Sequence, residues 1–295
     1  MKNIKINIYK AVFAFCVASA ISGCINRGSG ENTVKENTDA DFPYDLEHPV
    51  KYDMPQSLFE ISGITFQNGN PKETFAIQDE DGDLFHFGLE DKEAAFTKFG
   101  PKGDYEDLAI IKDRILVLKS NGDIFMFPVK DIGEEKAENV VKIKDLLPKA
   151  EYEGIAADEK NNKIYVLTKE RKEDIKAERT RIYAFDFTVD DALVPAGEID
   201  LSSKDIAQLS GNSKLKFRPS ALTKNTRTKE WYILSSINKL LVVADADFKV
   251  KGVYPLTAAH FNQPEGIAFD SDNHLYISNE GGTLSAGNVL MFSAK

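Results

Sequence analysis

The chain has 295 residues, of which 42% are hydrophobic and 28% charged, and its formal net charge is −10. These proportions are typical of a folded protein and exclude a fully disordered chain or one with many membrane spans. The acidic balance argues against nucleic-acid binding, because that function needs clustered positive charge. A closed all-β fold of this length can form a single domain.

The first 24 residues have the features of an export signal. Lys2, Lys5 and Lys10 precede an apolar stretch over 11–21, which is too short to cross a bilayer. The stretch ends in Ile-Ser-Gly-Cys, which is similar to a bacterial lipobox, where the peptide is cut before the cysteine and the thiol is acylated. We therefore expect a signal peptide over 1–23 and a lipid on Cys24; a plain signal peptide with an incidental cysteine is the alternative. Removing the three lysines would take the net charge from −10 to −13.

The only cysteines are Cys16, in the predicted signal, and Cys24. The mature domain is therefore expected to have no disulfide and no cysteine-based zinc or catalytic site. Residues after Cys24 are polar and lack hydrophobic periodicity, so acylated Cys24 and a flexible linker are expected over 24–43 and the folded domain over 44–295. The predicted location is the cell envelope, with the anchor in a membrane and the domain outside the cytoplasm. Ile25 and Asn26 are not acidic, which favours the outer membrane.

From residue 44 onward, short runs with strand character alternate with turn residues. Asn121-Gly122 and Asp81-Gly82 suit tight hairpins. Short helices are expected over 143–147 and 203–209. The expected strands cover 74–77, 84–87, 114–118, 124–127, 163–168, 181–185, 231–235, 239–243 and 275–278.

A repeated motif organises these strands. Five copies begin at Glu60 (EISGITF), Tyr105 (YEDLAII), Tyr152 (YEGIAAD), Arg218 (RPSALTK) and Pro264 (PEGIAFD). The aligned positions 63, 107, 154, 220 and 266 are separated by 44, 47, 66 and 46 residues. A period of about 45 residues with four strands is typical of a propeller blade. Small residues in the motif would let neighbouring backbones approach at the central channel.

Five copies predict an all-β, five-bladed propeller. We expect residues 44–58 to supply the outer strand of the last blade, so that the two chain ends close the ring. The long gap between the third and fourth copies fits an insertion over 202–217. A sixth, degenerate blade in that gap is the alternative.

The ordered motifs resemble a known family. The segments LFEISGI from Leu58, EDL from Glu106, YEGIA from Tyr152, PEGIAFD from Pro264 and LYISNE from Leu275 are similar to the SdiA-regulated domain family over residues 44–293. The resemblance implies a five-bladed propeller distantly related to NHL-repeat propellers, with a calcium site near the central channel and no established activity. The fourth motif departs from the pattern, because Pro-Ser at 219–220 replaces Glu-Gly.

A ring of carboxylates is the predicted site. Glu106, Glu153 and Glu265 occupy equivalent motif positions, and Glu60 lies two residues before the equivalent Ser62, on the same face of its strand. Like charges brought together raise each other's pKa or require a cation, and carboxylate oxygens suit Ca²⁺. A solvated acidic mouth without a specific metal is the alternative. Residues at the ends of second strands are expected to add ligands or line the rim: Asp79, Glu170 and Glu280.

Other motifs are better explained by turns and packing than by metal binding or catalysis. The segment from Gln78 to Asp83 lacks a full calcium-loop pattern, and Asp270-Ser-Asp-Asn-His reads as a turn between strands. The four histidines show no paired metal-binding spacing, and no Gly-x-Ser-x-Gly elbow is present.

Three functions are compatible with the sequence. The favoured hypothesis is a monomeric, membrane-anchored module that binds an unknown small molecule or protein and contacts no nucleic acid. The alternatives are a metal-dependent, lactonase-like hydrolase, in which calcium at the channel polarises a carbonyl or phosphate, and a purely structural envelope protein.

Overall fold

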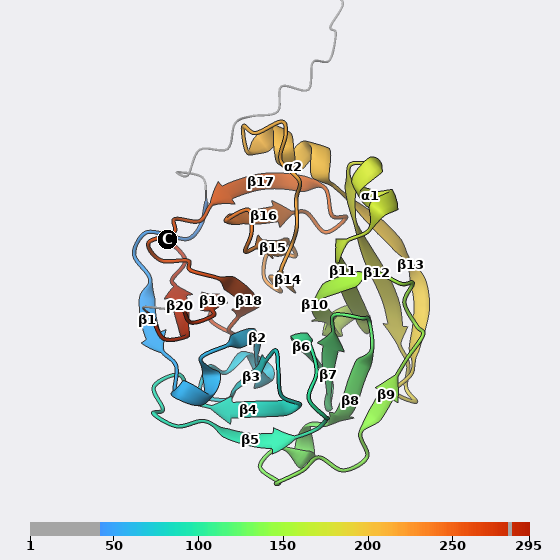
Figure 1. The fold of residues 1–295 in the computed structure, drawn as a ribbon, viewed down its shortest axis with the longest axis vertical. Helices are drawn as coiled ribbons and strands as arrows, with labels where there is room; N and C mark the ends of the chain where they lie inside the picture. Colours follow the sequence, from blue (N-terminus) through green and yellow to red (C-terminus); the bar gives the residue numbers. More distant parts are fainter. Residues whose placement is uncertain (1–41, 283–284) are drawn as a thin grey trace, which may run out of the picture. The chain divides into compact units, whose positions relative to one another are not determined.

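The computed structural model describes residues 42–282 and 285–295, and Figure 1 shows their strands arranged as blades around a centre. The described residues form five four-stranded antiparallel sheets, so the five-bladed propeller is confirmed. From the centre outward the sheets are β2 (Ile61–Phe66), β3 (Thr74–Gln78), β4 (Asp83–Phe87) and β5 (Ala95–Lys98); β6 (Tyr105–Ile111), β7 (Arg114–Lys119), β8 (Ile124–Pro128) and β9 (Val141–Ile143); β10 (Glu151–Asp158), β11 (Lys163–Glu170), β12 (Arg179–Phe187) and β13 (Leu193–Ser202); β14 (Ala221–Lys224), β15 (Trp231–Ser235), β16 (Leu240–Ala244) and β17 (Val250–Pro255); and β18 (Pro264–Phe269), β19 (Leu275–Asn279), β20 (Asn288–Phe292) and β1 (Val50–Asp53).

The N-terminal strand closes the ring, as predicted. β1 pairs antiparallel with β20, and Tyr52 lies opposite Val289. Beyond this pair, Tyr44 bridges Ala294, and the backbone N–H of Lys295 donates to the carbonyl of Pro43 at 2.8 Å. The last blade therefore takes strands from both ends of the described chain, which leaves no open edge at the seam.

The long gap between the third and fourth motifs holds no sixth blade. It is filled by long strands β12 and β13 and by α2 (Ser203–Leu209), whose N-cap Ser202 accepts a hydrogen bond from the N–H of Asp205 at 3.1 Å. The helix expected over 203–209 is thus confirmed. The helix expected over 143–147 is wrong, because Val141–Ile143 pairs with β8 as an outer strand and bends follow it. One short helix that was not expected, α1 (Lys172–Lys176), connects β11 to β12.

The inner strands approach one another closely, and the motif glycines allow it. A Cβ on Gly266 would lie 2.5 Å from the carbonyl oxygen of Ser62 in the neighbouring blade, and a Cβ on Gly63 would lie 2.7 Å from the Cα of Asp107. Backbone cannot yield at such distances, so only glycine fits. Farther out, large side chains fill the space between blades; Trp231, for example, packs between Tyr165 and Phe248 with ring centroids 4.6 and 4.5 Å apart.

Candidate functional site

The same backbone irregularity occurs at a glutamate near the start of three inner strands and changes the direction of its side chain. In β6 the register runs from Tyr105 to Asp107 and skips Glu106; β10 skips Glu153 and β18 skips Glu265 in the same way. Each glutamate is therefore the extra residue of a β-bulge, which leaves it unpaired and turns its side chain away from the ladder. The recurrence of the bulge gives the equivalent motif positions a shared structural role.

These glutamates interact electrostatically. Burial, together with the charge of Glu153, raises the pKa of Glu106 to about 9. Burial and the charge of Glu153 likewise raise the pKa of Glu265 to about 7. The Glu153 side chain is itself buried, which raises its pKa. The sequence prediction that Glu106, Glu153 and Glu265 form a mutually repelling group is consistent with this arrangement.

A lysine that the sequence did not single out lies within the group. Lys169, near the end of β11, places its Nζ 2.5 Å from Oε1 of Glu153, and its charge also acts on Glu106 and Glu265. One positive charge therefore partly offsets three carboxyls. Its only sequence signal is its place on the strand that follows the motif glutamate in the same blade, which does not distinguish it from surface lysines.

Asp107, beside Glu106, has a structural role. Its carboxylate is buried and accepts hydrogen bonds from the N–H of Leu108 at 2.8 Å and from the N–H of Ile155, in the next blade, at 3.0 Å. The side chain thus links the inner strands β6 and β10.

A second acidic group joins three more of the predicted residues. Burial raises the pKa of Glu60, Asp79 and Glu280, and the charge of Asp79 adds to the shift at both glutamates. Oδ1 of Asp79 is buried and has no hydrogen-bond partner. A buried carboxylate oxygen without a donor is costly, and a cation would satisfy it. We call Glu60, Asp79 and Glu280 the acidic mouth.

Glu170 lies apart from both groups. Its side chain forms an ion pair with Arg218, and both residues line a cavity between the third and fourth blades. The guanidinium already neutralises this carboxylate, so Glu170 is the predicted ligand that is least available to a metal.

A separate triplet could hold a metal ion. Asp270, Asp272 and His274 each place one ligand atom within 4.8 Å of the others, and within residues 42–282 and 285–295 no other group of three His, Cys, Asp or Glu side chains does so. The triplet lies at the β18–β19 hairpin, at the opposite end of β18 from Glu265. The turn predicted here is confirmed: the N–H of His274 donates to Oδ1 of Asp270 at 2.8 Å, and Tyr276 donates to Oδ2 at 3.0 Å.

The predicted signal peptide, Cys24 and nearly all of the linker lie outside the described residues and stay predictions. None of the helices in the described part of the chain is both long enough and apolar enough to cross a bilayer.

Comparisons with known proteins agree with the fold. No protein of curated function matches the sequence. Among solved structures, the chain is similar to a glutaminyl cyclase from Myxococcus xanthus, with 16% identity, a TM-score of 0.56 and coverage of 83% of this chain and 95% of that one. It is also similar to a luciferin-regenerating enzyme, with 9% identity, a TM-score of 0.50 and coverage of 84% and 96%. At such identities the likeness shows the fold alone.

The sequence model of the SdiA-regulated family matches residues 41–283. This span includes all five motifs, both acidic groups and the closing strand β1. The chain therefore belongs to the SdiA-regulated family.

Proposed function

We propose that this protein is a membrane-anchored binding module of the cell envelope that holds calcium at the acidic end of its channel and uses that face to bind a small molecule or protein. The observation that carries the proposal is the buried Oδ1 of Asp79, which has no hydrogen-bond partner, on a carboxylate whose charge acts on two others with raised pKa values. The anchor is the lipid predicted on Cys24.

Calcium fits the chemistry of this donor set. It takes six to eight oxygen ligands at about 2.3–2.6 Å and accepts carboxylates, backbone carbonyls and water in flexible geometry. The carboxylates are not gathered as tightly as the Asp270 triplet, so water or backbone oxygens would complete the shell. The acidic mouth is favoured over the Glu106, Glu153 and Glu265 group, because Lys169 already supplies a cation to the latter.

Calcium titration by calorimetry tests the proposal. The wild-type domain is expected to bind one calcium ion saturably, and Asp79→Asn is expected to weaken binding by about tenfold, which corresponds to about 1.4 kcal/mol. Asp247→Asn removes an equal charge from an exposed hairpin and should leave binding unchanged. Equal affinities for the two variants, or no heat of binding in the wild type, would contradict the proposal.

One observation favours the hydrolase alternative. Glu265, with a pKa near 7 and a hydrogen bond from the hydroxyl of Ser236, has the protonation balance of a general base or acid. In that case calcium would supply Lewis-acid polarisation of a carbonyl or phosphate. Calcium-dependent hydrolysis of aryl esters or lactones that disappears in Glu265→Gln would favour the enzyme over the binding module.

A further inference from the structure

A cavity of about 800 Å³ lies between the third and fourth blades. It is bounded by the end of β11, by α1, by the start of β12, by α2 and by the loop over 211–218. We call it the interblade cavity. Its volume is within the range of pockets that bind small organic molecules. About half of its lining residues come from α2 and the segment that follows it, in the insertion before the fourth motif.

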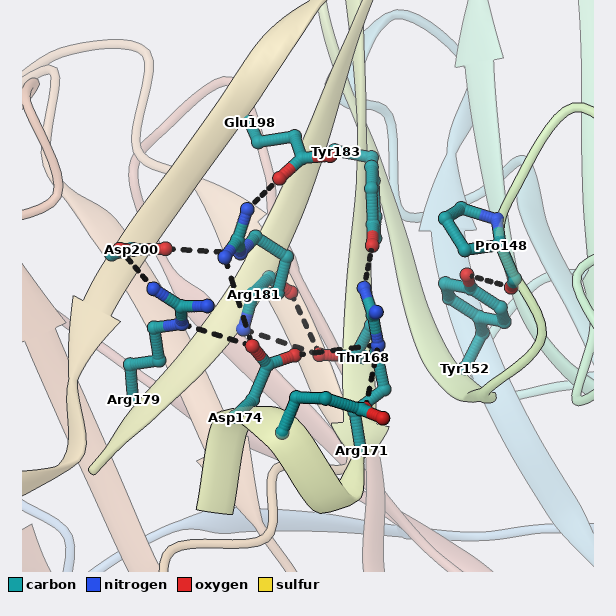
Figure 2. A network of polar contacts seen from close by, with 11 residues as sticks. Pro148, Tyr152, Thr168, Arg171, Asp174, Arg179, Arg181, Tyr183, Glu198 and Asp200 are labelled. Carbon is teal, nitrogen blue, oxygen red and sulfur yellow. Dashed lines mark hydrogen bonds and ion pairs between the residues drawn. The ribbon is translucent and has the colours of Figure 1, made fainter. Parts of the chain in front are cut away.

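The lining of the interblade cavity is basic, although the chain is acidic overall. Seven basic and three acidic side chains line it, a formal excess of four positive charges, against −10 for the whole chain. Two of the acidic side chains are already paired. Asp174 is buried and lies 2.9 Å from Nε of Arg179, with further guanidinium groups around it (Figure 2), and Glu170 pairs with Arg218.

The remaining positive charge is available to a ligand. Three lining lysines are exposed and form no ion pair with any described residue: Lys204, Lys214 and Lys216. In addition, Nε of Arg218 is buried and has no hydrogen-bond partner, although its Nη2 pairs with Glu170. An unpaired buried N–H is costly, and an anionic oxygen from a ligand would satisfy it.

The same cavity has apolar walls. Ala207 and Phe217 are buried side chains at its lining, and Leu215 and Ile175 add partly exposed apolar surface. Desolvation of this surface would stabilise an apolar group beside the cationic one. Inorganic anions alone would leave it exposed to water.

We propose that the interblade cavity binds a small amphiphilic anion, with a carboxylate or phosphate held by Arg218 and the three lysines and an apolar body held against Phe217 and Leu215. The site is independent of the calcium proposal. It shares only Lys169 with the channel, and the Nζ of that residue is engaged by Glu153.

Calorimetric titration with decanoate below its micellar concentration tests this site in the absence of calcium. We expect saturable binding of one molecule, and comparable binding of decyl phosphate. The neutral analogue decanol should bind about tenfold more weakly, because it lacks the charge-assisted hydrogen bonds. Inorganic phosphate, which lacks the apolar body, should also bind more weakly than decyl phosphate.

A double variant locates the binding. Lys214→Gln/Lys216→Gln is expected to weaken decanoate binding by about fivefold, since each exposed charge contributes a fraction of a kcal/mol to about 1 kcal/mol. The charge-matched control Lys92→Gln/Lys160→Gln changes exposed lysines of other surfaces and should bind as the wild type does. Equal losses in both variants, equal binding of decanol, or binding only to vesicles of anionic phospholipid with none to soluble decanoate would each overturn the proposal.

Discussion

Nζ of Lys169 lies 2.5 Å from Oε1 of Glu153, and its charge acts on all three glutamates of a group whose pKa values are raised. The Glu153 side chain is 6% exposed and the Lys169 side chain 28%, so solvent screens this pair only weakly. The positive charge of Lys169 therefore offsets part of the negative charge that the three bulged glutamates bring together.

Replacing Lys169 by methionine should therefore destabilise the domain. Removal of one partner leaves Glu153 buried without its cation, and we expect a loss of about 1–3 kcal/mol in the free energy of unfolding measured by urea denaturation. Lys163→Met, on the same strand, breaks an exposed pair with Asp186 and should cost about 0.5 kcal/mol or less. An equal effect of the two substitutions would show that Lys169 does not compensate buried charge.

The glutamate group should make stability fall as the pH rises. Glu106 has a pKa of about 9 in the folded protein against 4.5 for the ordinary group. Between these values the folded state keeps a proton that the unfolded state has lost, so each rise in pH lowers the free energy of unfolding. Glu265, with a pKa of about 7, acts in the same direction.

Glu106→Gln should remove part of this dependence. With chelator present, we expect the variant to be more stable than the wild type at pH 8 by about 1.4 kcal/mol or more, the equivalent of one pKa unit, and to differ little at pH 5. Thermal unfolding at a series of pH values measures both. A variant whose pH profile runs parallel to that of the wild type would contradict the assignment.

Close approach of the inner strands predicts a steric effect at Gly266. Alanine there would bring its Cβ to 2.5 Å from the carbonyl oxygen of Ser62, so backbone must move, and we expect a loss of about 2 kcal/mol or more. Gly88→Ala is the matched control, because its Cβ would meet only the flexible side chain of Asp91, at 3.2 Å. Comparable midpoints of thermal unfolding for the two variants would refute the packing argument.

The lipid anchor predicts where the protein is found in cells. Wild type should incorporate labelled palmitate and sediment with membranes, whereas Cys24→Ala should do neither. Cys16→Ala changes a cysteine within the predicted signal and should retain both properties. Label retained in Cys24→Ala, or no label in the wild type, would contradict acylation of Cys24.

The architecture could be predicted from the sequence because the repeat carries it. Motif glycines such as Gly63 and Gly266 report the crowding of inner strands, and their spacing reports the number of strands per blade. The prediction of a helix over 143–147 was wrong because pairing with β8, and not local periodicity, determines the extended conformation of Val141–Ile143.

The candidate site was less predictable. Motif alignment identified Glu106, Glu153 and Glu265, but Lys169 lies on the next strand of the same blade as Glu153 and meets that glutamate only when β10 and β11 pair. The pairing of Glu170 with Arg218 forms only when the third and fourth blades come together. Contacts between side chains far apart in sequence leave no periodic signal along the chain.

A crystal structure of the domain grown with calcium would show whether the acidic mouth binds the metal. We expect a calcium ion there, in contact with Oδ1 of Asp79 and with Glu60 or Glu280 as a further ligand. A metal bound only at Asp270, Asp272 and His274, or an acidic mouth without calcium at saturating concentration, would contradict this expectation.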